Sequence, residues 1–182
     1  HIADIEPGDR RNSFYGLAID VGTTTVVVEL VHMPEARVLS ALTEYNGQVL
    51  CGLDVISRIN YARSLKRREE LRSRVVDTIN NLITQLVTEH QISRNDVCNV
   101  AIAGNTTMMH LLLGLDPEQI RLDPYTPVAY QIPFLSAKES GININPNSWI
   151  SFAPSVGSYV GGDITSGLLC TSLSTDSEEI SL

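Results

Sequence analysis

GLAIDVGTTTVVVEL, residues 16–30, places a short polar insert between two apolar, β-branched segments. The flanking segments, 14–20 and 24–33, have the composition of strands, because β-branched side chains fit a pleated, half-buried surface. The insert, 20–25, holds an aspartate, a glycine and three consecutive threonines, which are typical of a turn. The stretch therefore predicts a β-hairpin with a polar turn. A third predicted strand, 37–45, extends the hairpin to an antiparallel meander.

After the meander the apolar period changes from that of a strand to that of a helix. Helices are predicted over 53–64 and, most strongly, over 69–91, where apolar residues repeat on one face. The nearly all-apolar run 97–104 predicts a central strand that is covered on both faces. The other predicted elements are a helix over 105–113, a proline-rich excursion over 121–147 with a short helix around 135–140, a strand over 149–153 and a helix over 157–173.

This order of elements predicts an α/β fold with a mixed sheet, in which the three-stranded meander is joined by parallel strands. Helices are expected on both faces of the sheet, and the order resembles the ribonuclease-H-like core. Outside this unit, the polar residues 1–13 are expected to form a linker or tail, and 174–182 an acidic linker.

The composition excludes several classes of protein. A net charge of −8 over 182 residues argues against a nucleic-acid partner. No apolar run is long enough to span a bilayer, so no membrane partner is expected, and the start of the chain lacks the apolar core of a signal peptide. The three cysteines, Cys51, Cys98 and Cys170, are far apart and in no metal-ligand spacing. They are therefore expected to be buried free thiols of a cytoplasmic protein.

The polar insert of the hairpin is a candidate phosphate site. Gly22 permits a positive φ and the close approach of a ligand to the backbone. The N–H groups of Gly22, Thr23 and Thr24 can form a concave nest for phosphate oxygens. The threonine hydroxyls, that of Thr25 included, add uncharged donors. Asp20 repels phosphate by itself, so it is expected to act as a ligand of a divalent cation that bridges the two. The alternative is a turn whose polar side chains bond only their own backbone.

Two later stretches carry further candidate residues. The predicted buried strand ends at Gly104, and Asn105 or Thr106 can cap the helix that follows, whose free N–H groups face the ligand-binding edge of the sheet. Ordinary capping is the alternative. His110 lies among apolar residues and is predicted to be a packing residue rather than a catalytic one. Asp163, in a glycine-lined helix, is a candidate for orienting a water or a metal ion, with a surface or capping role as the alternative.

Four stretches occur in an order that resembles one known family. They are the opening hairpin, NGQVLCGLDVISRINYA (46–62), AGNTTMMHLLLG (103–114) and PSVGSYVGGDITSGLL (154–169). Together they closely resemble the reductive activators of corrinoid proteins, within the acetate and sugar kinase, heat-shock chaperone and actin superfamily. One departure is Gly47, which stands where the family's Asn-Pro-Gln pattern has a proline.

The resemblance implies that 14–173 is the first lobe of an actin-like ATPase domain, with ATP and Mg²⁺ as cofactors. It implies that Asp20 lies at the cation, that Gly22 to Thr24 lie at the phosphates, and that Asn105 and Asp163 line the cleft, with both aspartates as catalytic residues. The cofactor-binding set implied is Gly22, Thr23, Thr24, Thr25, Gly104, Asn105 and Thr106.

For the parent protein, the resemblance implies a second ATPase lobe and a [2Fe-2S] ferredoxin domain in the same chain. Such a protein reduces cob(II)amide to cob(I)amide in a corrinoid iron–sulfur or methyltransferase protein, which would be its partner. The lobe alone is expected to be inactive, and it could form a homodimer. Two alternatives stay open: one lobe of a small-molecule kinase, and an interaction lobe without catalysis.

Overall fold

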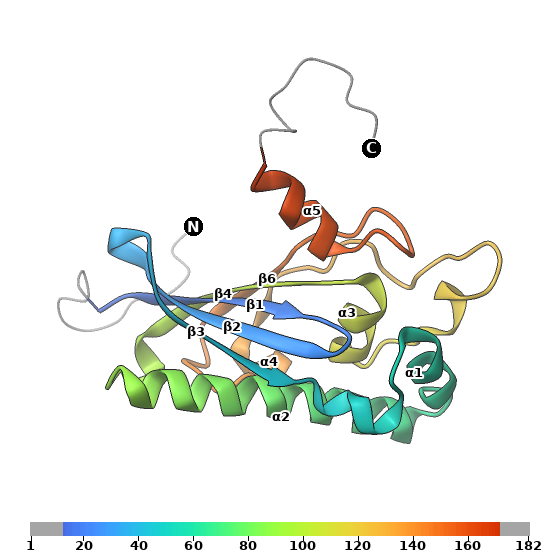
Figure 1. The fold of residues 1–182 in the computed structure, drawn as a ribbon, viewed down its shortest axis with the longest axis horizontal. Coiled ribbons are helices and arrows are strands. Elements are labelled where there is room, and N and C mark those ends of the chain that lie inside the picture. The colour runs from blue at the N-terminus through green and yellow to red at the C-terminus, as the bar shows by residue number, and fades with distance from the viewer. Residues whose placement is uncertain (1–12, 172–182) are drawn as a thin grey trace, which may run out of the picture.

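The computed structural model describes residues 13–171, and a six-stranded mixed sheet forms its centre (Figure 1). The strands are β1 (Tyr15–Val21), β2 (Thr25–His32), β3 (Arg37–Tyr45), β4 (Val97–Gly104), β5 (Leu135–Ser136) and β6 (Trp149–Phe152). Their order is β3-β2-β1-β4-β6-β5, with β1, β2 and β3 antiparallel and β1, β4 and β6 parallel. The predicted mixed sheet is confirmed. The two-residue β5, which pairs antiparallel with β6, is an edge strand where a short helix was predicted to begin.

Helices lie on both sides of this sheet, as predicted (Figure 1). They are α1 (Val55–Tyr61), α2 (Leu65–Glu89), α3 (Thr106–Leu113), α4 (Ala137–Ser140) and α5 (Gly162–Leu169). Short 3-10 helices span Met33–Glu35, Gly47–Cys51, Arg94–Asp96 and Glu118–Ile120. The long α2 runs along one face, and α5 stands on the opposite face (Figure 1). Among the described residues, no helix combines the length and the apolar character that a membrane crossing requires.

The core lies between the sheet and α2. Strand side chains alternate between faces, so β1 and β2 each send every second residue toward this helix. The buried residues that meet there include Leu17, Ile19, Val21, Val26, Val28 and Leu30 from the strands and Leu71, Val75, Ile79, Ile83 and Leu86 from α2. Helix α2 begins four residues before its predicted start because the Ser64 side chain caps it by accepting the N–H of Arg67.

The opposite face of the sheet is much less covered. In β4 the side chains of Val100 and Ile102 are buried, but Asn99 and Ala101 are exposed. The prediction that this strand is covered on both faces was therefore wrong. A run rich in alanine looks fully apolar in sequence, yet alanine tolerates exposure because its side chain has little apolar area to bury.

The last helix is shorter than predicted. The structure has α5 at Gly162–Leu169, while 157–160 form bends and Gly161 is extended, rather than the first turn of a helix. The end of the predicted helix, from residue 172, lies outside the described residues. The predicted linkers, 1–13 and 174–182, also lie outside them, apart from Ser13.

His110 links the long loop after α3 to the rest of the protein by a hydrogen bond. Its side chain is 1% exposed, and its Nδ1 lies 2.7 Å from the carbonyl oxygen of Thr106. The backbone N–H of Val128 donates to its Nε2 at 3.1 Å. Nδ1 therefore carries the proton and Nε2 accepts, which is the neutral imidazole. The prediction of a packing histidine is confirmed.

We expect this histidine to make stability depend on pH. Burial lowers the pKa of His110, against smaller raising effects of the Thr106 carbonyl and the charge of Asp116. Between the folded pKa and the unfolded value of about 6.5, the unfolded chain binds more protons than the folded one. The free energy of unfolding is therefore highest above about pH 6.5 and decreases as the pH falls below that value. Urea unfolding at a series of pH values should show this loss for the natural protein and a flatter profile for His110→Gln. Equal slopes would contradict it.

Candidate functional site

The predicted site residues meet at one edge of the sheet. The carboxyl ends of β1, β4 and β6 lie together there, because these three strands are parallel neighbours. In α/β sheets, ligands bind at this edge. Asp20 lies near the end of β1, the loop 22–24 follows, and Asn105 follows β4. The Asn105 Nδ2 donates to the Thr23 hydroxyl at 3.2 Å, so residues far apart in sequence come into direct contact.

The β1–β2 loop, residues 22–24, is anchored through all three of its carbonyl groups. Asn46 holds two of them: its Nδ2 donates to Gly22 O at 2.9 Å and its backbone N–H to Thr24 O at 2.8 Å. Arg58 Nη2 donates to Thr23 O at 2.5 Å. In a trans peptide the carbonyl and the following N–H point in opposite directions. The N–H groups of Thr23 and Thr24 therefore face away from Asn46 and Arg58, toward the outside of the loop.

Gly22 has a different role from the one predicted. Its φ is not in the positive range, so the turn does not use the positive φ that a glycine permits. A Cβ on Gly22 would lie 2.7 Å from the carbonyl oxygen of Thr25. The glycine is needed because the hairpin's own two strands approach closely at this point.

A buried polar network supports the loop from behind. Asn46, Gln48 and Arg58 are each 0% exposed. Asn46 Oδ1 accepts the N–H of Gln48 at 3.0 Å, and Gln48 Oε1 accepts from Arg58 Nη1 at 3.2 Å. The Gly47 N–H donates to the Thr78 hydroxyl at 3.2 Å, which a proline could not do. Where the expected Asn-Pro-Gln pattern has a proline, this chain has Gly47, and Thr78 accepts the N–H that a proline would lack. The sequence analysis used this stretch only for its resemblance to the family and did not assign these residues to the site.

The start of α3 closes the second side of the site. Asn105 is the cap, since its Oδ1 accepts the N–H of Met108 at 3.0 Å while its Nδ2 holds Thr23. A Cβ on Gly104 would lie 2.7 Å from the Val21 carbonyl oxygen, so β1 and β4 need this glycine where they end. The buried Thr106 donates its hydroxyl to Gly157 O at 2.8 Å. That hydroxyl therefore holds the segment before α5.

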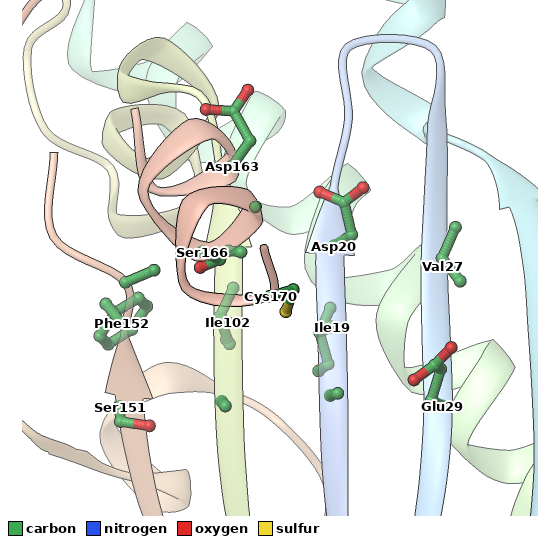
Figure 2. Close-up of a pocket in the computed structure, with 15 residues that line it drawn as sticks. Ile19, Asp20, Val27, Glu29, Ile102, Ser151, Phe152, Asp163, Ser166 and Cys170 are labelled. Carbon is green, nitrogen blue, oxygen red and sulfur yellow. The ribbon is translucent and has the colours of Figure 1, made fainter. Parts of the chain in front are cut away.

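Asp20 and Asp163 face the same cavity, of about 700 Å³, between the open face of the sheet and α5 (Figure 2). Small side chains of the sheet, such as Ala18 and Ala101, leave this space open. Burial raises the pKa of Asp20, and the negative charge of Asp163 raises it further. Asp163 lies in the first turn of α5, where its Oδ1 accepts the N–H of Ile164 at 2.8 Å. It is exposed, in agreement with the surface or capping role that was the alternative.

The donor set fits a magnesium ion. Mg²⁺ in proteins is usually held by one or two carboxylates, together with waters and phosphate oxygens. A cation between Asp20 and Asp163 would relieve the repulsion that raises the pKa of Asp20. Within 13–171 there is no group of three or more metal-ligating side chains, so a cation here would need further ligands from water or substrate.

The cysteines differ from the prediction of buried thiols. Cys170 is exposed and lines the same cavity as Asp20, and Cys51 and Cys98 are half-buried. In the described part of the chain they do not gather into a set that could ligate an iron–sulfur cluster. No step involving such a cluster is assigned to these residues.

Comparisons with known proteins relate this chain to one family. The model of the family described as "RACo middle region" matches residues 15–176. The "Corrinoid activation enzyme RamQ" of Eubacterium limosum is 32% identical over 166 residues, which cover 91% of this chain and 28% of that protein. The solved structure of a "Reductive activator for corrinoid,iron-sulfur protein" is 49% identical with a TM-score of 0.90, covering 92% of this chain and 27% of its own. The chain spans little more than a quarter of these relatives, and it belongs to the RACo middle region family.

Proposed function

We propose that this chain is the phosphate-binding lobe of an ATP-dependent activator that returns cob(II)amide to cob(I)amide in a corrinoid protein. One observation carries the proposal: a loop with all three carbonyls anchored lies beside two carboxylates that face one cavity. The names of the relatives support corrinoid activation over the kinase alternative. Because those relatives are more than three times longer, the complete reaction belongs to a larger protein of which this chain is one part.

Each residue of the site has a role in this proposal. The outward N–H groups of Thr23 and Thr24, with the threonine hydroxyls, bind phosphate oxygens. Asp20 and Asp163 hold Mg²⁺, either directly or through its waters. The bound Mg²⁺ would neutralise phosphate charge during hydrolysis. Asn105 keeps the Thr23 side chain oriented through its 3.2 Å hydrogen bond.

The coupling to cobalt reduction follows from where α5 begins. Reduction of cob(II)amide is uphill for a modest-potential iron–sulfur donor, so nucleotide energy must enter through a change of conformation or affinity. Asp163 is in the first turn of α5, and the segment before this helix is bonded to Thr106 at the start of α3. A change at the phosphate site would therefore reach α5, which we propose forms half of the hinge to a second lobe.

Titration of the full-length protein with Mg-ATP tests the proposal. We expect saturable binding, and ATP-dependent loss of the cob(II)amide absorption when a corrinoid protein and a reductant are present. Residues 1–182 alone should bind Mg-ATP at least about tenfold more weakly, because a single lobe supplies phosphate contacts and lacks the rest of the site. Absence of nucleotide binding by the full-length protein would refute the proposal.

A further inference from the structure

Arg58, in α1, is a fully buried cation whose hydrogen-bond partners are all neutral. Its side chain is 0% exposed, and it takes part in none of the ion pairs among residues 13–171. Its guanidinium donates hydrogen bonds to four atoms. Nε donates to Gly52 O at 2.9 Å, and Nη2 donates to Thr23 O at 2.5 Å. Nη1 donates to Gln48 Oε1 and to Met108 Sδ, at 3.2 Å each.

This arrangement is costly for structure alone. A buried guanidinium loses its hydration, and neutral acceptors compensate less than a carboxylate would. Burial accordingly lowers the pKa of Arg58, while Cys51 and Asp54 raise it. The nearby carboxylate of Asp54 is engaged elsewhere, since it accepts the N–H of Ser57 at 2.8 Å to cap α1. The guanidinium nevertheless stays protonated, because arginine is effectively always charged in proteins. Asp54 thus compensates the positive charge only through space, and no carboxylate forms a salt bridge with Arg58 behind the β1–β2 loop among residues 13–171.

The other charged side chains near the loop are negative. Asp20, two residues before the loop, and Asp163 line one cavity, and both would repel a phosphate group. The loop itself, residues 22–24, contains no lysine or arginine. Within the described chain, Arg58 is the cationic side chain that bonds this loop. An anion bound on the outward face would be attracted by this charge through the Thr23 peptide group.

We infer that Arg58 is a positioning residue of the site: it holds the Thr23 carbonyl inward, turns the next amide outward and supplies the positive charge that favours a phosphate group at the loop. This inference rests on the proposed function, since it assumes that the loop binds phosphate. It assigns Arg58 of α1 to the phosphate site. It also explains why an arginine, rather than a neutral donor, fills this buried position.

Binding of inorganic pyrophosphate with Mg²⁺ to the full-length protein tests the inference, with calorimetry at several salt concentrations. Arg58→Gln removes the charge, Arg58→Lys keeps it, and Arg74→Gln is a control that removes an arginine paired with Glu70 on α2. We expect Arg58→Gln to weaken binding about tenfold or more, the scale of losing one interaction with a charged group. Its affinity should also depend less on salt. Arg58→Lys keeps a charge but loses the guanidinium fork, so it should weaken binding less than Arg58→Gln and keep the salt dependence of the natural protein. Arg74→Gln should match the natural protein in both.

The outcomes separate this inference from the proposed function. If the natural protein binds neither pyrophosphate nor Mg-ATP, the proposed function and the inference both fail. If it binds and a folded Arg58→Gln variant binds equally well with the same salt dependence, only the inference fails. If Arg58→Gln does not fold, as a melting curve would show, Arg58→Lys decides. In that variant the charge is lost as the pH rises through the pKa of the lysine, so binding should weaken there relative to the natural protein. An unchanged ratio of the two affinities would overturn the role of the charge.

Discussion

Replacing Asp20 with asparagine should make the protein more stable at neutral pH and slow ATP hydrolysis by the full-length protein about a hundredfold or more. Burial and the charge of Asp163 raise the pKa of Asp20 above its ordinary value. Between the unfolded and the folded pKa, the folded state binds more protons, so stability is lost as the pH rises through the folded pKa. At neutral pH the ionised Asp20 is therefore destabilising. Asparagine removes that charge, and with it the proposed ligand of Mg²⁺.

The measurement pairs chemical unfolding with steady-state ATP hydrolysis. We expect Asp20→Asn to unfold at higher urea concentration near pH 7 and to lose its advantage below about pH 4, where the natural carboxyl is protonated in both states. Hydrolysis should fall about a hundredfold or more, the scale of losing one preorganised electrostatic contact in a transition state. Glu29→Gln is the matched control, because Glu29 lines the same cavity from the neighbouring strand. A variant that is less stable than the natural protein, or equally active, would contradict the expectation.

Local signals in the sequence were sufficient for several of the elements around the site. The strand at Arg37–Tyr45 and the one at Val97–Gly104 have the predicted bounds, because each is a β-branched or apolar run with turn residues at its ends. Helix α3 follows its cap Asn105 and ends at Gly114, which is left-handed with φ of 70°. These features depend on neighbours in the chain, so the sequence displays them directly.

The features that the sequence did not predict depend on partners far along the chain. Arg58 bonds a carbonyl 35 positions earlier, and nothing in its own stretch shows that a loop lies there. The exposure of one face of β4 depends on how little of the sheet α5 covers. Likewise, glycines at 157–167 were interpreted as one helix face, but Gly161 is extended, with φ of −91° and ψ of −174°. Tertiary packing, rather than the glycine pattern, sets the start of α5.

Replacing Gly161 with alanine should separate α5 from the site. A Cβ there would lie 2.5 Å from the Cα of Asn105 and 2.7 Å from the backbone nitrogen of Thr106. Both atoms are backbone at the capped start of α3, so they cannot move aside as the end of a flexible side chain could. The cost is steric, since any residue can adopt the extended conformation of Gly161. We expect the variant to be destabilised by about 1–3 kcal/mol, the usual range for overpacking.

Gly161→Ala should also lower the activity of the protein that remains folded. Asp163 lies two residues further on, so displacement of this segment would carry its carboxylate away from Asp20 and leave an incomplete Mg²⁺ site. Hydrolysis should then fall about a hundredfold, because an error of about 1 Å in the position of a reacting group costs that much. Gly157→Ala is the matched control: a Cβ there meets nothing within 4 Å, in the same segment before α5. If both variants kept activity while only Gly161→Ala lost stability, the contact between this segment and α3 would be structural, and Asp163 would not depend on it for its position in the site.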